Sequence, residues 1–353
     1  MSGSLFKQNP LTRYTTPPNN YFGSTIFLSY IVVALYLTST ICYSLYKQYT
    51  TAFHSHPASP PSKFKQNGRG KVETRSARKR HVKIYTVLAL VSFASISWHM
   101  LGFLITSLLN WSGSKTRNVG AVLGRDGVGA LGRWMLETSL FSDFAVQLVD
   151  DGESAVWTQS AILATWFWNL WFAEKGRQYG FTTRTMLPFI VLGQNLPISF
   201  AAALFVINLH LSAPDITPYP SDDQKSREKT QHAHPKQTPI ASIILPTLLL
   251  NATLLAQSSL RRHPGFSYLI LAERLLLVLP HTGLLKITRS DVHRSAAISG
   301  GFVVANLAML RHNLSVSSVF SALVWKGQAV KTMGWDAVLS AVVYAVLGWG
   351  GGV

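Results

Sequence analysis

The chain has 353 residues, of which 48% are hydrophobic and only 13% are charged. Soluble domains carry about 25% charged residues, so this composition, with several apolar runs near membrane length, excludes an ordinary soluble domain and favours a polytopic membrane protein. The net charge is +17, but more than half of this excess lies in one segment, because ten basic residues and one acidic residue occur from Lys47 to Lys83. We interpret this segment as a loop that contacts anionic membrane lipid, and we expect no nucleic-acid partner.

The apolar runs predict an all-α fold, a polytopic transmembrane helical bundle with seven or eight spans. We expect four regions along the chain. They are a flexible N-terminal tail at 1–20, a first span at 21–46, a basic cytoplasmic loop at 47–83 whose Pro-, Ser- and Gly-rich composition predicts disorder, and the remaining bundle at 84–353 with hydrophilic loops at 111–155 and 212–238.

Within the bundle, the second span is expected between residues 83 and 110. Part of the long connection that follows, 133–149, has the apolar spacing of an amphipathic helix that lies at the membrane interface. The later spans are expected at 156–173, 185–211, 239–258, 266–285, 295–310 and 336–349, with the apolar stretch 314–325 along the surface.

The distribution of basic residues predicts the orientation. Basic loops face the cytoplasm, so we expect 47–83 to be cytoplasmic and the N-terminus to be lumenal. The turn 174–184 agrees with this orientation, and so do Arg261 and Arg262. Three further basic residues disagree, because this span count places them on the lumenal side: Lys286, Arg289 and Arg294.

Polar residues recur inside the third and fourth spans, where they are costly. Thr158, Thr165 and Asn169 share one helical face, and Gln194 and Asn208 lie two heptads apart. Such residues either join helices by hydrogen bonds or line a polar substrate cavity that has an aromatic wall suited to stabilising cations. The residues that we assign to the cavity are Trp166, Trp168, Asn169, Gln194, Asn195, Asn208 and His99.

Glu273 is the most natural buried acid of the predicted spans. Apolar surroundings would keep its carboxyl group protonated and ready to donate, which makes it the candidate catalytic residue. The alternative is a structural pair with another helix. Arg274 points about 100° away on the helix, so Glu273 and Arg274 are not expected to face one partner.

No metal and no cofactor is predicted. The run Asp150-Asp151-Gly152-Glu153 resembles a diphosphate-binding aspartate motif, but its third acid is one position early, and acids at the start of a helix explain it. The single cysteine, Cys42, excludes a cysteine-based zinc site, and nucleotide-binding and hydrolase motifs are lacking.

Two segments, WTQSAILATWFWNLWFAEKGRQYGF and TMLPFIVLGQNLPISFAAALF, resemble the integral-membrane proteins encoded beside fungal indole-diterpene (paxilline-type) pathways. The resemblance covers mainly the third and fourth spans. It implies a role in secondary metabolism at the endoplasmic reticulum, alongside a prenyltransferase, a flavin epoxidase and a membrane cyclase. It transfers no catalytic residues.

Three functions follow as hypotheses. The first is a terpene cyclase or cyclase accessory, in which Glu273 protonates an epoxide or olefin and Trp166 and Trp168 line the path of the cation. The second is a transporter or exporter of an apolar metabolite, which the prolines inside the spans favour. The third is a membrane scaffold for the pathway enzymes.

Overall fold

The computed structural model describes residues 17–53, 68–113, 119–124, 127–195, 197–212, 242–261, 263, 266–285, 287–310 and 315–349. Within these ranges the chain is built from helices and contains no strand, which confirms the predicted all-α class. Most of the predicted N-terminal tail and most of the loop 212–238 lie outside the described residues.

Three of the described helices are long and apolar enough to cross a membrane. They are α1 (Tyr21–Phe53), the part Ser76–Ser112 of α2 (Gly68–Ser112), and α14 (Gln328–Trp349). The prediction of seven or eight such spans therefore exceeds what helix length and composition support. One reason is length: α11 (Phe266–Val278) has 13 residues, and at 1.5 Å per residue it reaches about 20 Å, less than the roughly 30 Å of a bilayer core.

The basic segment 47–83 is partly helical, contrary to the prediction of a disordered loop. Helix α1 continues to Phe53 and α2 begins at Gly68, while 54–67 lies outside the described residues. Alanine, arginine and lysine are good helix formers, so the run that precedes the second span extends the apolar helix instead of ending it.

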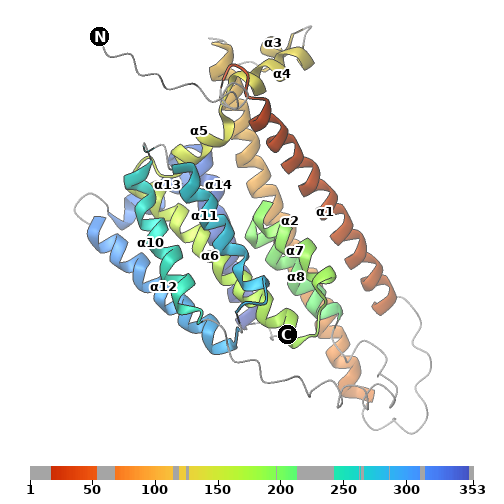
Figure 1. Ribbon diagram of the computed structural model, residues 1–353. Coiled ribbons are helices and arrows are strands. Elements are labelled where there is room, and N and C mark those ends of the chain that lie inside the picture. The colour runs from red at the N-terminus through yellow and green to blue at the C-terminus, as the bar shows by residue number, and fades with distance from the viewer. Residues whose placement is uncertain are drawn as a thin grey trace, which may run out of the picture.

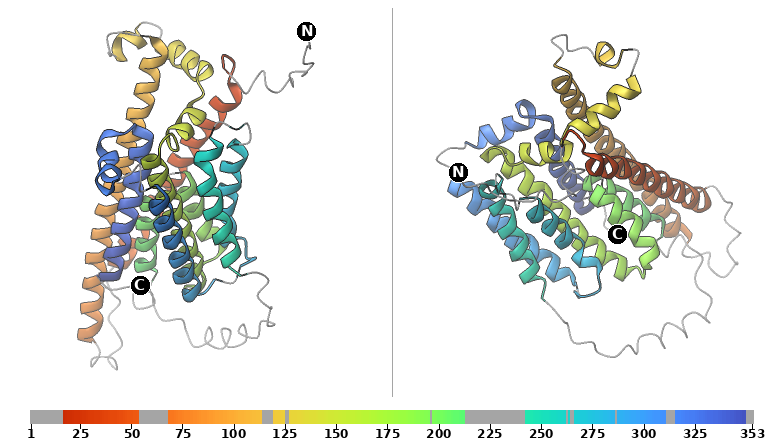
Figure 2. Two further views of the ribbon diagram at one scale, coloured as in Figure 1. Left: turned by 90° about the vertical axis from the view of Figure 1, so that its left-hand side faces the viewer. Right: turned by 45° about the horizontal axis from the view of Figure 1, so that its top comes forward.

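The connection after α2 contains three short helices at the end of the molecule where α1 begins and α2 ends (Figures 1 and 2). They are α3 (Val119–Leu123), α4 (Gly127–Glu137) and α5 (Leu140–Gln147). The prediction of a single amphipathic helix over 133–149 is therefore wrong, because two helices, α4 and α5, occupy this region. Asn20, at the start of α1, caps the end of α4. Its Nδ2 donates to the Thr138 carbonyl at 3.1 Å, and its backbone N–H donates to the Leu136 carbonyl at 3.0 Å.

Helix α6 (Gly152–Gln178) lies in the middle of the bundle and contacts α8, α10, α12, α13 and α14. It begins where the sequence predicts a helix start. The Asp151 carboxylate accepts a hydrogen bond from the Ser154 backbone N–H at 2.9 Å, and Glu153 lies in the first turn.

The predicted fourth span, 185–211, is two short helices that fold back on each other. Helix α7 (Thr183–Asn195) and α8 (Ile198–Leu211) pack together on either side of Pro197. The ring of Phe205 lies 5.4 Å from that of Phe189. Both residues are eight positions from Pro197, so residues at equal distances from the turn lie side by side. The segment is a helical hairpin with its tip at 195–198, and both of its outer ends lie at the same end of the bundle.

The remaining helices complete the bundle around α6: α10 (Ile244–Leu260), α11, the 3₁₀ turn Leu279–His281, α12 (Arg289–Leu310) and α13 (Val316–Trp325). Helices α10 and α12 run in the same direction, because Thr247 pairs with Ser295 and Asn251 pairs with Ser299 one turn later. Helix α14 then passes between α2, α6 and α8, and it ends near the outer ends of the hairpin (Figure 1).

Candidate functional site

The tip of the α7–α8 hairpin is the most unusual polar feature of the bundle. A chain reversal inside packed helices leaves backbone groups without intrahelical partners. Here side chains from other helices supply the partners. The Tyr30 hydroxyl of α1 donates to the Asn195 carbonyl, and Arg274 of α11 donates to the Gln194 carbonyl at 3.4 Å.

Asp336 of α14 caps the other side of the tip. Its Oδ2 accepts a hydrogen bond from the Ile198 backbone N–H and its Oδ1 accepts one from the Ser199 backbone N–H, both at 3.0 Å. The side chain is buried. A carboxylate is well suited to this place, because the first N–H groups of a helix carry partial positive charge. Four elements, α1, α11, α14 and the hairpin, therefore meet at Gln194, Asn195, Ile198 and Ser199.

The predicted amides are divided between this tip and the rest of the hairpin. The side-chain nitrogen and oxygen of Gln194 are buried and have no hydrogen-bond partner among the described residues. Asn195 takes part through its carbonyl group. Asn208 lies more than two turns further along α8, where it is buried and its Nδ2 has no partner in the described chain. The tip thus gathers two of the three amides.

Trp166 and Trp168 of the predicted aromatic wall are packed between side chains and line neither of the cavities described below. The Trp166 indole N–H donates to Ser295 Oγ at 2.8 Å, and the ring is almost completely buried. Trp168 packs edge-on against Trp171 with ring centroids 5.2 Å apart, within a cluster that includes Phe172. Asn169 Oδ1 is 2.9 Å from His281 Nε2. Trp166 and Asn169 thus join α6 to other elements, as the first of the two alternatives drawn from the sequence expects.

Glu273 and Arg274 face different helices, as their adjacent positions predict. Glu273 is 2% exposed, and its Oε2 accepts a hydrogen bond from Gln257 Nε2 of α10 at 2.5 Å. Arg274 reaches the hairpin instead. Glu273 lines neither of the cavities described below, and its hydrogen bond goes to Gln257 and not to Trp166, Trp168 or the hairpin amides.

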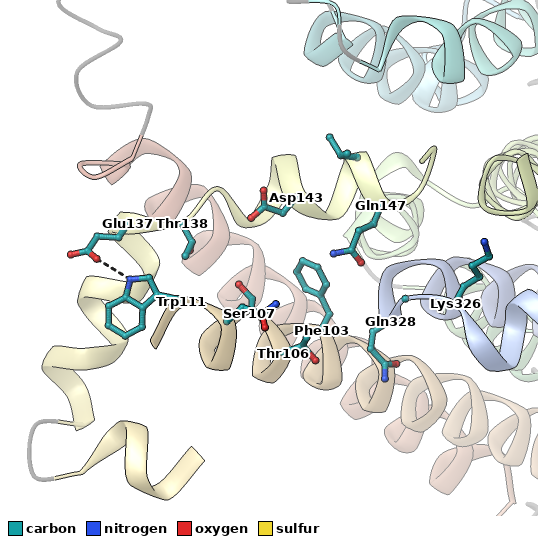
Figure 3. Close-up of a pocket in the computed structure, with 13 residues that line it drawn as sticks. Phe103, Thr106, Ser107, Trp111, Glu137, Thr138, Asp143, Gln147, Lys326 and Gln328 are labelled. Carbon is teal, nitrogen blue, oxygen red and sulfur yellow. Dashed lines mark hydrogen bonds between the residues drawn. The ribbon is translucent and has the colours of Figure 1, made fainter. Parts of the chain in front are cut away.

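A cavity of about 940 Å³ lies at the end of the bundle where the α3–α5 connection crosses α2. Figure 3 shows that side chains of α2 line one side of the cavity and side chains of α5 line the other. The α13–α14 turn lies at a third side. Its apolar and aromatic lining includes Phe103, Trp111 and Val146, and its polar lining includes Asp143, Gln147 and Gln328. We call this space the interfacial pocket.

Two acids with different surroundings line the interfacial pocket. Glu137 accepts a hydrogen bond from the Trp111 indole N–H at 2.8 Å. Asp143 has no hydrogen-bond or charged partner for its carboxyl group within the described chain. Partial burial raises the pKa of the Asp143 carboxyl above its ordinary value. Of the two acids, Asp143 is therefore the one whose carboxyl group is free to contact a ligand in the pocket.

Two contacts support the wall of the interfacial pocket, and only one of them involves a residue that the sequence analysis assigned to a cavity. His99 Nδ1 is 3.0 Å from Gln328 Oε1, so the predicted cavity residue His99 supports a lining residue without lining the pocket itself. Lys326 donates to Asp151 Oδ2 at 2.7 Å and lies 3.4 Å from Glu153. This bridge fixes the α13–α14 turn to the start of α6.

Asp336, Tyr30 and Asp143 were missed by the sequence analysis. Asp336 stood at the expected first residue of the last span, whereas α14 begins eight residues earlier at Gln328. A helix start at Gln328 would have shown Asp336 as an acid inside an apolar helix. No comparable signal marks Asp143, because its place in the pocket depends on the packing of α5 against α2 and α14.

The fold and these sites define an all-α protein with membrane-length helices, a capped helical hairpin and an interfacial pocket. No protein-family model, no curated protein and no solved structure matches the chain. The resemblance to proteins of indole-diterpene pathways therefore stays a prediction from the two sequence segments.

Proposed function

We propose that this chain is a multi-pass membrane protein of fungal terpenoid metabolism that binds a prenyl-bearing intermediate in the interfacial pocket, as a cyclase or cyclase accessory. The interfacial pocket is the observation that carries this proposal. It combines aromatic and apolar lining with an acid whose carboxyl group is unpaired and whose pKa is raised.

Exposed apolar surface supports a membrane location. Helix α1 has 33 residues but only three of them are buried, and it exposes large apolar side chains such as Val32, Leu35 and Tyr36 along its length. Such a continuous apolar surface is rare on proteins surrounded by water. Lipid would cover it without cost.

The hairpin reverses the expected direction of every later helix, and the basic residues then agree better with the positive-inside rule. If 185–211 enters and leaves on one side, Arg289 and Arg294 come to the same side as the basic segment 47–83, which removes their conflict with the positive-inside rule. Arg261 then moves to the opposite side, where Asp150 accepts its hydrogen bond. We expect the basic side to be cytoplasmic and the N-terminus to be lumenal in the endoplasmic reticulum.

The chemistry that fits the interfacial pocket is protonation. In its protonated form, Asp143 would donate a proton to an epoxide oxygen or an olefin of the bound intermediate, and attack by a neighbouring double bond would close a ring. Loss of a proton from the product restores the balance. The rings of Phe103 and Trp111 would stabilise the positive charge that develops between these steps.

A producing host tests the proposal. We expect deletion of the gene to remove a cyclised product and to accumulate its linear precursor, and the variant Asp143→Asn to lower the product about 100-fold, the usual contribution of a general acid. Asp150→Asn removes an exposed acid at the same end of the molecule and is expected to leave the product unchanged.

Glu273→Gln decides between the two candidate acids. The amide oxygen can still accept from Gln257, so the fold is retained. Normal product with Glu273→Gln and loss with Asp143→Asn supports the interfacial pocket. The reverse result would return the acid role to Glu273 and overturn the assignment of Asp143.

An exporter of an apolar metabolite is the second candidate. The capped hairpin tip favours it, because transporters use broken helices whose ends lie deep in the membrane. Accumulation of the finished product inside the deletion strain, with no linear precursor, would support export and would contradict catalysis.

A further inference from the structure

A second cavity lies at the other end of α14 from the interfacial pocket. It has a volume of about 420 Å³ and is formed by the end of α6, the start of α12 and the end of α14. Helix α14 lines the interfacial pocket with Gln328 and this cavity with Tyr344. Sixteen residues of helix separate them, which corresponds to about 24 Å.

Basic side chains surround the mouth of this cavity. They are Lys175 of α6 and Arg289 and His293 of α12, with Glu174 as the one acid in the lining. Arg289 and His293 are one turn apart and therefore share a face of α12. Both are exposed, and neither makes a hydrogen bond or ion pair with another described residue. Both side chains are therefore available to a ligand in the cavity.

The lining also contains an aromatic wall from α6 and α14. Phe167 and Tyr344 pack edge to face with ring centroids 5.0 Å apart, and Trp171 lies one turn from Phe167 on α6. Phe167 is nearer the middle of α6 than Lys175, so the aromatic wall continues from the basic mouth into the apolar part of the bundle. Tyr344 is 41% exposed, which leaves this wall open at the side of the bundle.

We propose that this cavity binds an amphiphile whose phosphate group carries a net negative charge, with the phosphate at Arg289 and His293 and the apolar chain along Phe167 and Tyr344. Arginine suits this role because its planar group donates two parallel hydrogen bonds to phosphate oxygens. The site does not rest on the proposed terpenoid function or on Asp143. The phosphate belongs either to an acidic phospholipid of the surrounding leaflet or to a prenyl diphosphate.

Native mass spectrometry of the full chain in detergent tests the site. The probes are dioleoyl phosphatidic acid, dioleoyl phosphatidylcholine, geranylgeranyl diphosphate and inorganic phosphate. We expect at least one anionic amphiphile to bind about tenfold more tightly than phosphatidylcholine, which carries no net charge. Inorganic phosphate alone is expected to bind weakly, because it lacks the chain that covers the aromatic wall.

Matched variants locate the binding. Arg289→Gln is expected to weaken it about tenfold, which is the effect of losing one charge-assisted contact. Arg294→Gln removes the same charge from the same helix but lies outside the cavity, so it is expected to change binding little. Thermal unfolding of each variant shows whether the fold is kept, and Arg289→Lys is expected to recover part of the affinity.

The two sources of phosphate give different results. Preference for phosphatidic acid identifies a lipid site, and preference for the prenyl diphosphate, with competition between the two, identifies a metabolite site. Equal loss with Arg289→Gln and Arg294→Gln would mean diffuse attraction to a basic surface. That result, or equal binding of phosphatidylcholine, would overturn the proposal.

Discussion

Asp336 shows how one side chain can determine the shape of a much larger element. Its two carboxylate oxygens hold the first two N–H groups of α8, and no other described residue caps that end. Pro197 precedes these groups and has no N–H of its own, so the turn depends on an acceptor from outside the hairpin. The sequence marks the break by Pro197 but does not indicate which residue satisfies it.

Replacing Asp336 tests this capping role. We expect Asp336→Ala to lower the free energy of unfolding by about 2 kcal/mol, because two buried N–H groups lose a charged acceptor. Asp336→Asn keeps one acceptor oxygen and is expected to cost less. Ser340→Ala is the control, because Ser340 lies one turn away and bonds only within its own helix. Equal losses for Asp336→Asn and Asp336→Ala, measured by denaturation in detergent, would contradict capping.

At the scale of elements, helix content is predictable and chain direction is not. The run ISFAAALFVINLHL is mostly apolar, so the sequence predicts that one span continues beyond Pro197. Nothing in its composition distinguishes a kink from a full reversal, because both place apolar residues on every side. The tryptophans of α6 were likewise recognised as a group, but the hydrogen-bond partners of Trp157 and Trp166 are Val319 of α13 and Ser295 of α12, which are far away in sequence.

The docking of α13 on α14 and α6 depends on Gly334. A Cβ at this position would overlap Leu323 Cδ2 and lie 3.3 Å from Trp157, whose indole N–H is fixed by the Val319 carbonyl. We expect Gly334→Ala to lower the free energy of unfolding by about 1–3 kcal/mol through overpacking. Gly300→Ala in α12 meets no atom within 4 Å and is expected to stabilise the protein by up to about 1 kcal/mol. If Gly334→Ala and Gly300→Ala changed the free energy of unfolding in the same direction, the close packing of Leu323 and Trp157 against Gly334 would be contradicted.

The bridge between Asp151 and Lys326 predicts a pH dependence for the attachment of the α13–α14 turn. Partial burial raises the pKa of Asp151, but hydrogen bonds from Lys326 and Ser154 and the lysine charge lower it by more, so it lies below its ordinary value. The hydrogen bond to Asp151 raises the pKa of Lys326. The carboxylate therefore contributes stability above pH about 4 that is lost as the pH falls through its folded pKa.

Asp151→Asn isolates this contribution. Asparagine also caps helices, so the start of α6 is expected to persist while the ion pair is lost. Because both side chains are about one-third exposed, the pair is worth at most about 1 kcal/mol. The difference in unfolding free energy between the native chain and the variant should shrink from pH 6 to pH 3. A constant difference would show that the charge of Asp151 contributes nothing.

For the whole molecule, the decisive question is whether residues 183–211 cross the membrane. One continuous helix would place Thr182 and Ser212 on opposite sides, whereas the hairpin returns the chain to the side on which it entered. Every later helix changes its direction accordingly. The hairpin also brings the basic residues of α12 to the end of the bundle where α1 ends and α2 begins (Figure 1), so the two interpretations differ for half of the chain.

Cysteine labelling in sealed membranes distinguishes these topologies. In a background of Cys42→Ser, we expect Thr182→Cys and Ser212→Cys to react with a membrane-impermeant maleimide from the same side. Val128→Cys, in the exposed start of α4 at the other end of the bundle, is expected to react from the opposite side. Labelling of Thr182→Cys and Ser212→Cys from opposite sides would contradict the hairpin and would show that residues 183–211 cross the membrane once. It would also separate Arg289 from the basic segment 47–83, because each later helix would then cross in the other direction.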